Sequence, residues 1–153
     1  MALLSSKLIA LVEDHWEQIT SQVIRKIRDD PEFVKLKHFP ETELREWGRR
    51  TLKRLGHSLD EPGETELMHH YEEVGRTWTL EGVPMHEIVR AAQIFRSRMV
   101  DFVREQGLAR DTIDVFAEEE LEYRVARFFD GLVYHIVKGC ETAHAATAAA
   151  GKR

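Results

Sequence analysis

Residues 111–140 read DTIDVFAEEELEYRVARFFDGLVYHIVKGC, and this stretch does most to decide the fold. Its apolar residues recur every three or four positions, as on the buried face of an α-helix: they are Phe116, Leu121, Val125, Phe128, Leu132 and Ile136. Asp111 or Thr112 is a suitable N-cap. A helix over the whole stretch is on the order of 45 Å long, against about 30 Å for the diameter of a small domain. We therefore expect part of it to protrude or to meet a second subunit.

The same apolar spacing predicts helices in four earlier segments, which lie at about 5–29, 44–59, 67–78 and 85–102. Residues that break helices separate them, with prolines at 31, 40, 62 and 84 and a glycine at 107. Strand-like alternation of polar and apolar residues does not persist anywhere in the sequence. The prediction is an all-α fold of five or six helices with a long C-terminal helix.

Composition limits the size, partners and location of the protein. A chain of 153 residues with 42% hydrophobic content suits one core, so we expect a helical domain at 1–142 and an alanine-rich tail or linker at 143–153. A net charge of -5 argues against a nucleic-acid binder. The only cysteine is Cys140, no apolar stretch approaches the roughly 20 residues of a membrane span, and the N-terminal residues do not look like a secretory signal. A cytoplasmic protein that is not inserted in a membrane is expected.

Two short histidine patterns are candidate chemical sites. Glu66, His69 and Glu73 share one helical face at the spacing of an iron-binding unit, but a di-iron bundle repeats that unit on a second helix, and the sequence holds no second copy. A solvated helix face is the favoured interpretation. His86 and Glu87 look like the start of a histidine-kinase phosphoacceptor helix, but the match is short and no glycine-rich nucleotide site accompanies it. An exposed histidine near a helix N-terminus is favoured there.

No catalytic constellation is evident. Cys140 has no nearby pattern of base and orienting group, and none of the serines lies in a nucleophile-elbow context. The run of glutamates at 118–120 is more typical of a solvated face than of general acid–base catalysis. We expect a sensory or regulatory protein and not an enzyme, with no cofactor.

Residues 75–92, GRTWTLEGVPMHEIVRAA, resemble the N-terminal sensor domains of RsbR-type co-antagonist proteins of the bacterial stressosome. The shared features are a tryptophan-bearing helix, a Gly-hydrophobic-Pro corner, an amphipathic helix and a long last helix. The resemblance implies a globin-like fold without haem, a homodimer formed through the last helices, and a role in passing a signal to a C-terminal effector module. The sequence ends at Arg153 without such a module, so an excised domain and a stand-alone relative both stay open, as does the downstream signalling partner.

A haem- or metal-binding helical sensor is the alternative. If the last two helices are those of a globin, the proximal histidine belongs near residues 74–79, where there is none. His15 and His135 lie beside apolar stripes and could face inward, although a hydrogen-bonded histidine is the more common role there. His69, His70 and His135 are the residues that could hold a haem or a metal in this alternative.

Candidate contact residues follow from the expected faces of the helices. Those for a ligand have mixed character and lie on or beside the stripes of the third and fourth helices: Tyr71, Trp78, Arg90, Gln93 and Arg96. Trp78 suits the core equally well, and the arginines equally suit a surface on which only their stems are buried. The dimer contact is predicted on the last helix, at Leu121, Val125, Phe128 and Leu132.

Overall fold

The computed structural model describes residues 2–151, with side chains from residue 4 onward. This part of the chain contains seven α-helices, one short 3-10 helix and no strand. The elements are α1 (Ala2–Asp14), α2 (Trp16–Asp29), η1 (Leu36–His38), α3 (Glu41–Leu52), α4 (Leu55–Ser58), α5 (Glu61–Leu80), α6 (Met85–Glu105) and α7 (Thr112–Gly151). The all-α fold and the long C-terminal helix are thereby confirmed.

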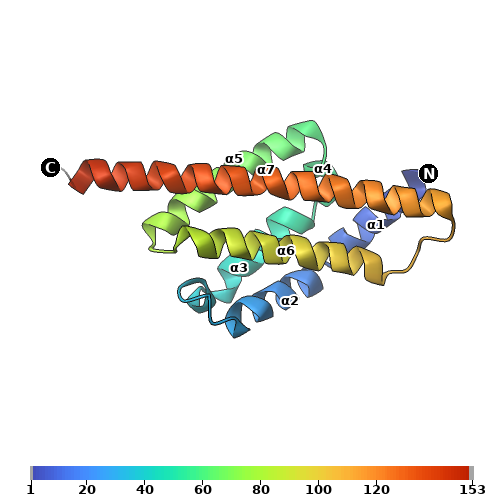
Figure 1. Ribbon diagram of the computed structural model, residues 1–153, viewed down its shortest axis with the longest axis horizontal. Coiled ribbons are helices and arrows are strands. Elements are labelled where there is room, and N and C mark those ends of the chain that lie inside the picture. Colours follow the sequence, from blue (N-terminus) through green and yellow to red (C-terminus); the bar gives the residue numbers. More distant parts are fainter. Residues whose placement is uncertain (1, 152–153) are drawn as a thin grey trace.

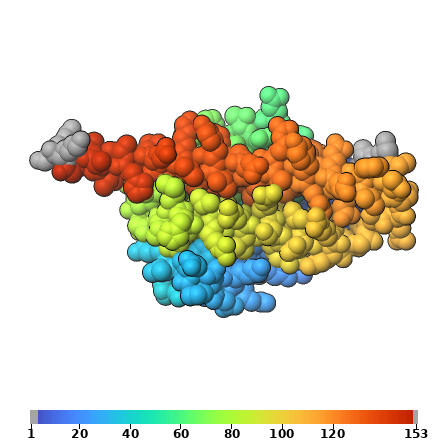
Figure 2. Space-filling view, viewed as in Figure 1, coloured from blue at the N-terminus to red at the C-terminus, as the bar shows by residue number. Residues whose placement is uncertain are grey.

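Helix α7 runs along the whole molecule, with α5 and α6 packed against it (Figure 1). It has 40 residues and is therefore about 60 Å long. Its start is capped as predicted, because the Asp111 carboxylate accepts the Asp114 N–H at 2.8 Å and the Asp114 carboxylate accepts the Arg110 N–H at 2.9 Å. The alanine-rich residues 144–151 continue the helix, are exposed, and project beyond the other helices (Figure 2). The proposed domain boundary at 142/143 stays a prediction.

Two of the expected helices are each divided in two. The sequence predicts one helix over 5–29, but His15 has φ -108° and ψ 21°, and its ring Nδ1 bonds to the Leu11 carbonyl oxygen at 2.9 Å. This break allows α1 to pack on α4 and α7 while α2 packs on α3, η1 and α6. The segment at 44–59 is likewise interrupted at Lys53 and Arg54, which separate α3 from α4. Apolar spacing continues across both breaks, so it could not reveal them.

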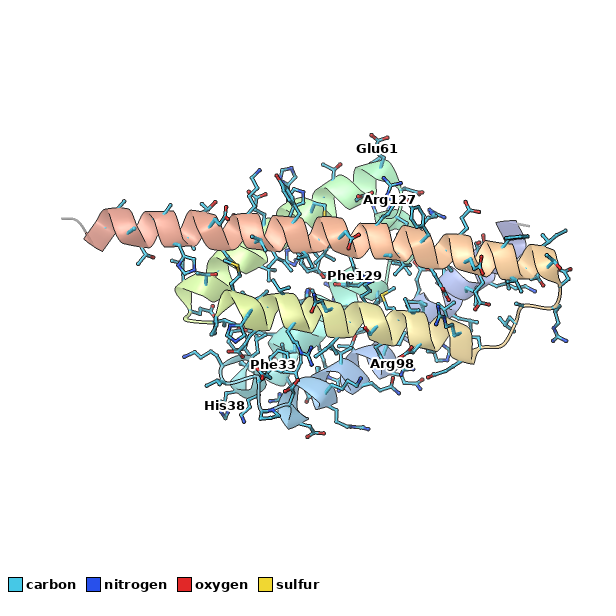
Figure 3. The ribbon with its side chains drawn as sticks, viewed as in Figure 1. Phe33, His38, Glu61, Arg98, Arg127 and Phe129 are labelled. Carbon is cyan, nitrogen blue, oxygen red and sulfur yellow. The ribbon has the colours of Figure 1, made fainter. Side chains whose placement is uncertain are left out.

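The buried side chains form one core. An aromatic cluster joins α3, α5 and α6, with the Trp47 ring centroid 5.1 Å from that of Phe95, 5.6 Å from Trp78 and 6.2 Å from Tyr71. Phe129 of α7 is 2% exposed and lies in the layer beneath that helix (Figure 3). The predicted stripe of α7 is buried from Leu121 to Ile136. Phe116, which the sequence placed on the same stripe, is 64% exposed, because its position in the helical repeat turns it to the opposite side of α7. Within residues 2–151, none of the helices has the length and apolarity that a membrane crossing requires.

Candidate functional site

The contact between α5 and α7 depends on two glycines. A Cβ added to Gly139 of α7 would lie 2.0 Å from the Glu72 carbonyl oxygen, and one added to Gly75 of α5 would lie 2.2 Å from the Ile136 carbonyl oxygen. The two backbones can approach this closely only because both positions lack a side chain. Buried Cys140 lies at the same place, with its Sγ 3.6 Å from the Gly75 carbonyl oxygen. The two helices are therefore in direct backbone contact over about one turn.

Charged side chains surround this contact. His135 Nδ1 of α7 lies 3.2 Å from Glu72 Oε2 of α5, and Lys138 Nζ lies 4.0 Å from the same oxygen. At the other end of α7, Arg104 of α6 forms a two-pronged ion pair with Glu122 at 2.8 and 3.0 Å. These contacts are partly exposed, so each contributes only modest stability.

A second face of α7 is apolar in part and uncovered within the described chain. Ile113, Phe116, Tyr123 and Tyr134 are 53%, 64%, 63% and 64% exposed, and their spacing places them on one side of the helix, away from the core. The Arg127 guanidinium lies 5.9 Å from the centroid of the Tyr123 ring. We call these four residues the outer face of α7.

A cleft of about 590 Å³ opens at the start of α6, and we call it the α6 cleft. Met85, His86, Arg90 and Gln93 contribute to its lining from α6, and Phe33 faces them from the loop after α2. This volume falls within the range of small-molecule sites. The shape of the cleft depends on Glu87, a 1% exposed carboxylate whose Oε1 accepts the backbone N–H groups of Lys35 and Leu36 at 3.1 Å each. Glu87 thereby holds the loop and η1 against α6.

The five predicted ligand-contact residues lie in three places. Arg90 and Gln93 come together at the α6 cleft, where Arg90 also pairs with Asp30 at 3.5 Å. Tyr71 and Trp78 belong to the aromatic core, and the Tyr71 hydroxyl bonds to Thr51 Oγ1. Arg96 is exposed and lies 3.9 Å from Asp130 of α7. The structure therefore groups only two of the five around one cavity.

The four predicted dimer-contact residues are buried within the chain. Leu121, Val125, Phe128 and Leu132 are 0–3% exposed and form part of the single core. They could meet a second subunit only if α7 were exchanged between two chains. A contact on these four residues stays a prediction, whereas the apolar side chains that α7 exposes are those of its outer face.

The residues considered for metal, haem or phosphate chemistry are dispersed. Glu73 pairs with Arg76 at 2.8 Å, His69 is exposed, and the described residues include no group of three metal-binding side chains. His15 is exposed at the break between α1 and α2, and His135 is paired with Glu72. His86 is exposed on the first turn of α6, at the rim of the α6 cleft.

Sequence reasoning did not identify three features of these sites. Gly139 interrupts a helical pattern, and an isolated glycine of that kind often marks a close packing contact. The outer face of α7 follows from the helical spacing of Ile113, Tyr123 and Tyr134, but Phe116, which shares that spacing, was assigned to the buried stripe. Glu87 gave no such signal, because a glutamate in the first turn of a helix ordinarily interacts with the helix dipole in solvent.

Comparison with known proteins gives one match. The family model described as the RsbT co-antagonist protein rsbRD N-terminal domain matches residues 17–153. The searches of curated proteins and of solved structures find no match. The matched range begins at the second residue of α2 and includes every later element of the described chain.

Proposed function

The chain belongs to the family of RsbT co-antagonist protein rsbRD N-terminal domains, a stressosome-related signalling family, and we propose that it senses a ligand or partner and relays the response through a helical homodimer. In this role the domain is regulatory and catalyses no reaction. Its further partner is a downstream signalling protein or effector domain, and it acts in the cytoplasm without binding nucleic acid or inserting into a membrane.

The observation that carries this proposal is the way α7 is built into the domain. Its central part is in backbone contact with α5, and its final residues, 144–151, project beyond the core. A shift of α5 or α6 that carries α7 with it displaces the projecting end. A ligand that binds one arrangement better than the other thereby changes what a partner at that end encounters.

The α6 cleft is the place that we propose for the input. Arg90 and Gln93, both predicted as ligand contacts, lie there with the exposed ring of His86. The loop held by Glu87 forms the opposite wall, and α6 packs along α7. Occupation of the cleft would therefore act on a helix that contacts α7 directly.

The outer face of α7 is the place that we propose for contact between subunits. Phe116 and Tyr123 lie on the side of α7 opposite its buried stripe, and each exposes more than half of its surface. Aromatic side chains in such a position are typical anchors of protein interfaces. Tyr134 extends the same face toward the projecting end of α7, so that a parallel dimer formed here would hold two projecting ends side by side.

Sedimentation equilibrium tests the dimer. We expect the mass of a dimer for the unmodified chain and that of a monomer for Phe116→Glu with Tyr123→Glu. The matched control is Val34→Glu with Leu80→Glu, which likewise replaces two exposed apolar residues by glutamate, but outside α7, and should leave the dimer intact. A strict monomer at high protein concentration would contradict relay through a homodimer. Loss of the dimer in Leu121→Ala alone, with the outer-face variant still dimeric, would favour exchange of α7.

A further inference from the structure

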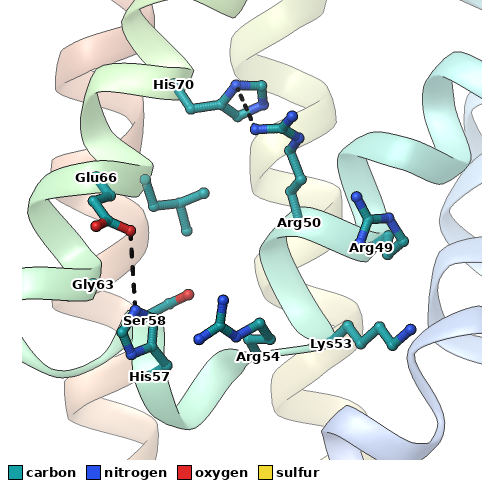
Figure 4. Close-up of a pocket in the computed structure, with 10 residues that line it drawn as sticks. Arg49, Arg50, Lys53, Arg54, His57, Ser58, Gly63, Glu66 and His70 are labelled. Carbon is teal, nitrogen blue, oxygen red and sulfur yellow. Dashed lines mark hydrogen bonds and ion pairs between the residues drawn. The ribbon is translucent and has the colours of Figure 1, made fainter.

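A second cleft, on the far side of α5 from α7, is lined by basic residues. It has a volume of about 240 Å³ and lies between the end of α3, α4 and the first half of α5 (Figure 4). We call it the basic cleft, and its cationic and imidazole side chains are those of Arg49, Arg50, Lys53, Arg54, His57 and His70. Glu66 is the only carboxylate in the lining. This is a local excess of positive charge in a chain whose net charge is -5.

Two of the arginines point into this cleft. In Figure 4, Arg50 reaches from α3 toward His70, and Arg54 reaches toward His57, whereas Lys53 extends away from the gap. Arg50 Nη1 lies 3.5 Å from His70 Nδ1, which accepts its hydrogen bond. His57 Nε2 lies 4.0 Å from Glu66 Oε2. Cationic and imidazole groups from α3, α4 and α5 thus converge on one small volume.

Neighbouring carboxylates neutralise this charge only in part. Glu46 binds Arg49 at 2.6 Å and Arg50 Nε at 3.2 Å, and the hydrogen bond from Arg49 lowers the pKa of Glu46 to about 2. Among the described residues, Arg54 and Lys53 have no carboxylate within 4.0 Å. The outer part of Arg50 faces His70, whose pKa is lowered by burial and by the charge of Arg50. The cleft therefore holds more positive charge than its own carboxylates balance.

We propose that the basic cleft binds a phosphate-bearing small molecule, with the phosphoryl group between Arg50 and Arg54 and in reach of His57 and His70. Planar guanidinium groups bind phosphate oxygens in pairs, and the imidazoles add further donors once protonated. The size of the cleft limits the ligand, because about 240 Å³ is less than the usual volume of a site for a drug-sized molecule. A phosphoryl group with a small organic part fits these dimensions, and a dinucleotide does not.

The position of this cleft connects it with the rest of the molecule. His70 belongs to α5, the helix whose opposite side is in backbone contact with α7. An anion held by Arg50 and Arg54 and in reach of His70 would tie α3 to α5 more firmly. The binding proposal itself does not depend on a signalling role, since it concerns only the charge and the geometry of the cleft.

The test is an NMR titration of the protein with inorganic phosphate and with pyrophosphate at constant ionic strength. We expect saturable shifts of the His57 and His70 imidazole signals, and none of His144, which lies on the exposed end of α7. Arg50→Gln with Arg54→Gln should weaken binding at least about tenfold, as the loss of charge-assisted hydrogen bonds requires. The matched control is Arg25→Gln with Lys26→Gln, which removes two positive charges from the exposed side of α2 and should leave binding unchanged.

Several results would overturn the proposal. These are equal shifts of His57, His70 and His144, equal weakening in the two double variants, or no saturation with either anion. Co-sedimentation with vesicles that contain phosphatidic acid, without binding of soluble phosphate or pyrophosphate, would assign the charge to a membrane surface instead. Circular dichroism checks that the Arg50 and Arg54 variant folds. If it does not fold, the shifts in the unmodified protein decide the question. Shifts confined to His57 and His70 support the cleft, and shifts that extend to His144 contradict it.

Discussion

On the side of α5 and α6 that faces α7, the helices meet through backbone and apolar side chains, whereas on the side that faces α2, η1 and α3 buried polar groups connect the segments. Gly75 and Gly139 represent the first kind of contact. Glu87, which accepts two backbone N–H groups, and Tyr71, which bonds to Thr51, represent the second.

The difference reflects the length of the elements. Helix α7 satisfies its own backbone hydrogen bonds and needs only a close-fitting surface, which a glycine contact supplies. The loop before η1 leaves N–H groups without helical partners, so a buried carboxylate has to accept them. Disturbing the α7 side should therefore affect the whole molecule, and disturbing the opposite side should loosen one segment.

The largest expected effect is that of Gly139→Ala. Its methyl group would lie 2.0 Å from the Glu72 carbonyl oxygen, so α5 and α7 must separate, at a cost of about 3 kcal/mol in the free energy of unfolding. Urea denaturation measures this loss. Gly131→Ala on the same helix is the control, because its nearest neighbour is the Met68 side chain at 3.7 Å. It should gain up to about 1 kcal/mol from the higher helix propensity of alanine. Equal effects of the two substitutions would contradict the close contact.

Next in size is Glu87→Ala, on the opposite side. It leaves the N–H groups of Lys35 and Leu36 without their acceptor and should lower the free energy of unfolding by about 2 kcal/mol. Hydrogen exchange should show faster exchange at Lys35 and Leu36 and little change along α7. His86→Ala is the neighbouring control. Because the His86 side chain is exposed, its removal should change the free energy of unfolding by less than about 0.5 kcal/mol. Uniform acceleration of exchange along the chain would mean that the two sides are not independent.

Tyr71→Phe should have a smaller effect, about 1 kcal/mol, because Thr51 Oγ1 still donates to the Trp47 carbonyl oxygen at 2.7 Å after the tyrosine hydroxyl is lost. Burial raises the pKa of Tyr71 well above its ordinary value of 10.0. The stability that the neutral phenol contributes is therefore complete below pH 10.0 and is lost as the pH rises toward the raised pKa. The free energy of unfolding, measured at increasing alkaline pH, should fall in the unmodified protein and fall less in Tyr71→Phe. Tyr123→Phe, at an exposed position, is the control and should behave as the unmodified protein does.

The apolar stripes made one side of this comparison largely predictable. Val125, Phe128 and Leu132 were assigned to a buried face from spacing alone, and they are buried, whereas Phe116, assigned to the same face, is exposed. Burial of a periodic stripe is a local property of a helix, so the sequence expresses it directly. The same logic made the N-cap at Asp111 predictable, because the capping groups are neighbours in the sequence.

Contacts between residues that are distant in the sequence were harder to predict. Glu87 and Lys35 are 52 residues apart, and nothing local in either segment indicates their hydrogen bond. The basic cleft likewise joins Arg50 to His70 across 20 residues. Candidate ligand residues were chosen by helical face, and two of them, Arg90 and Gln93, line one cleft. Helical face alone could not show that Tyr71 and Trp78 pack on a different helix.

The smallest expected effect concerns His70, at the polar edge of the side that faces α3. Burial and, next, the charge of Arg50 lower its pKa from 6.5, so the neutral imidazole contributes its stability above pH 6.5 and loses it as the pH falls through the lowered pKa. An NMR pH titration without added phosphate should give a pKa below 6.5 in the unmodified protein and a higher one in Arg50→Gln. Lys53→Gln, whose side chain points away from His70, should leave the value unchanged. The same pKa in Arg50→Gln as in the unmodified protein would show that Arg50 does not face the ring in solution, and that the positive charge of the cleft is solvated and not concentrated.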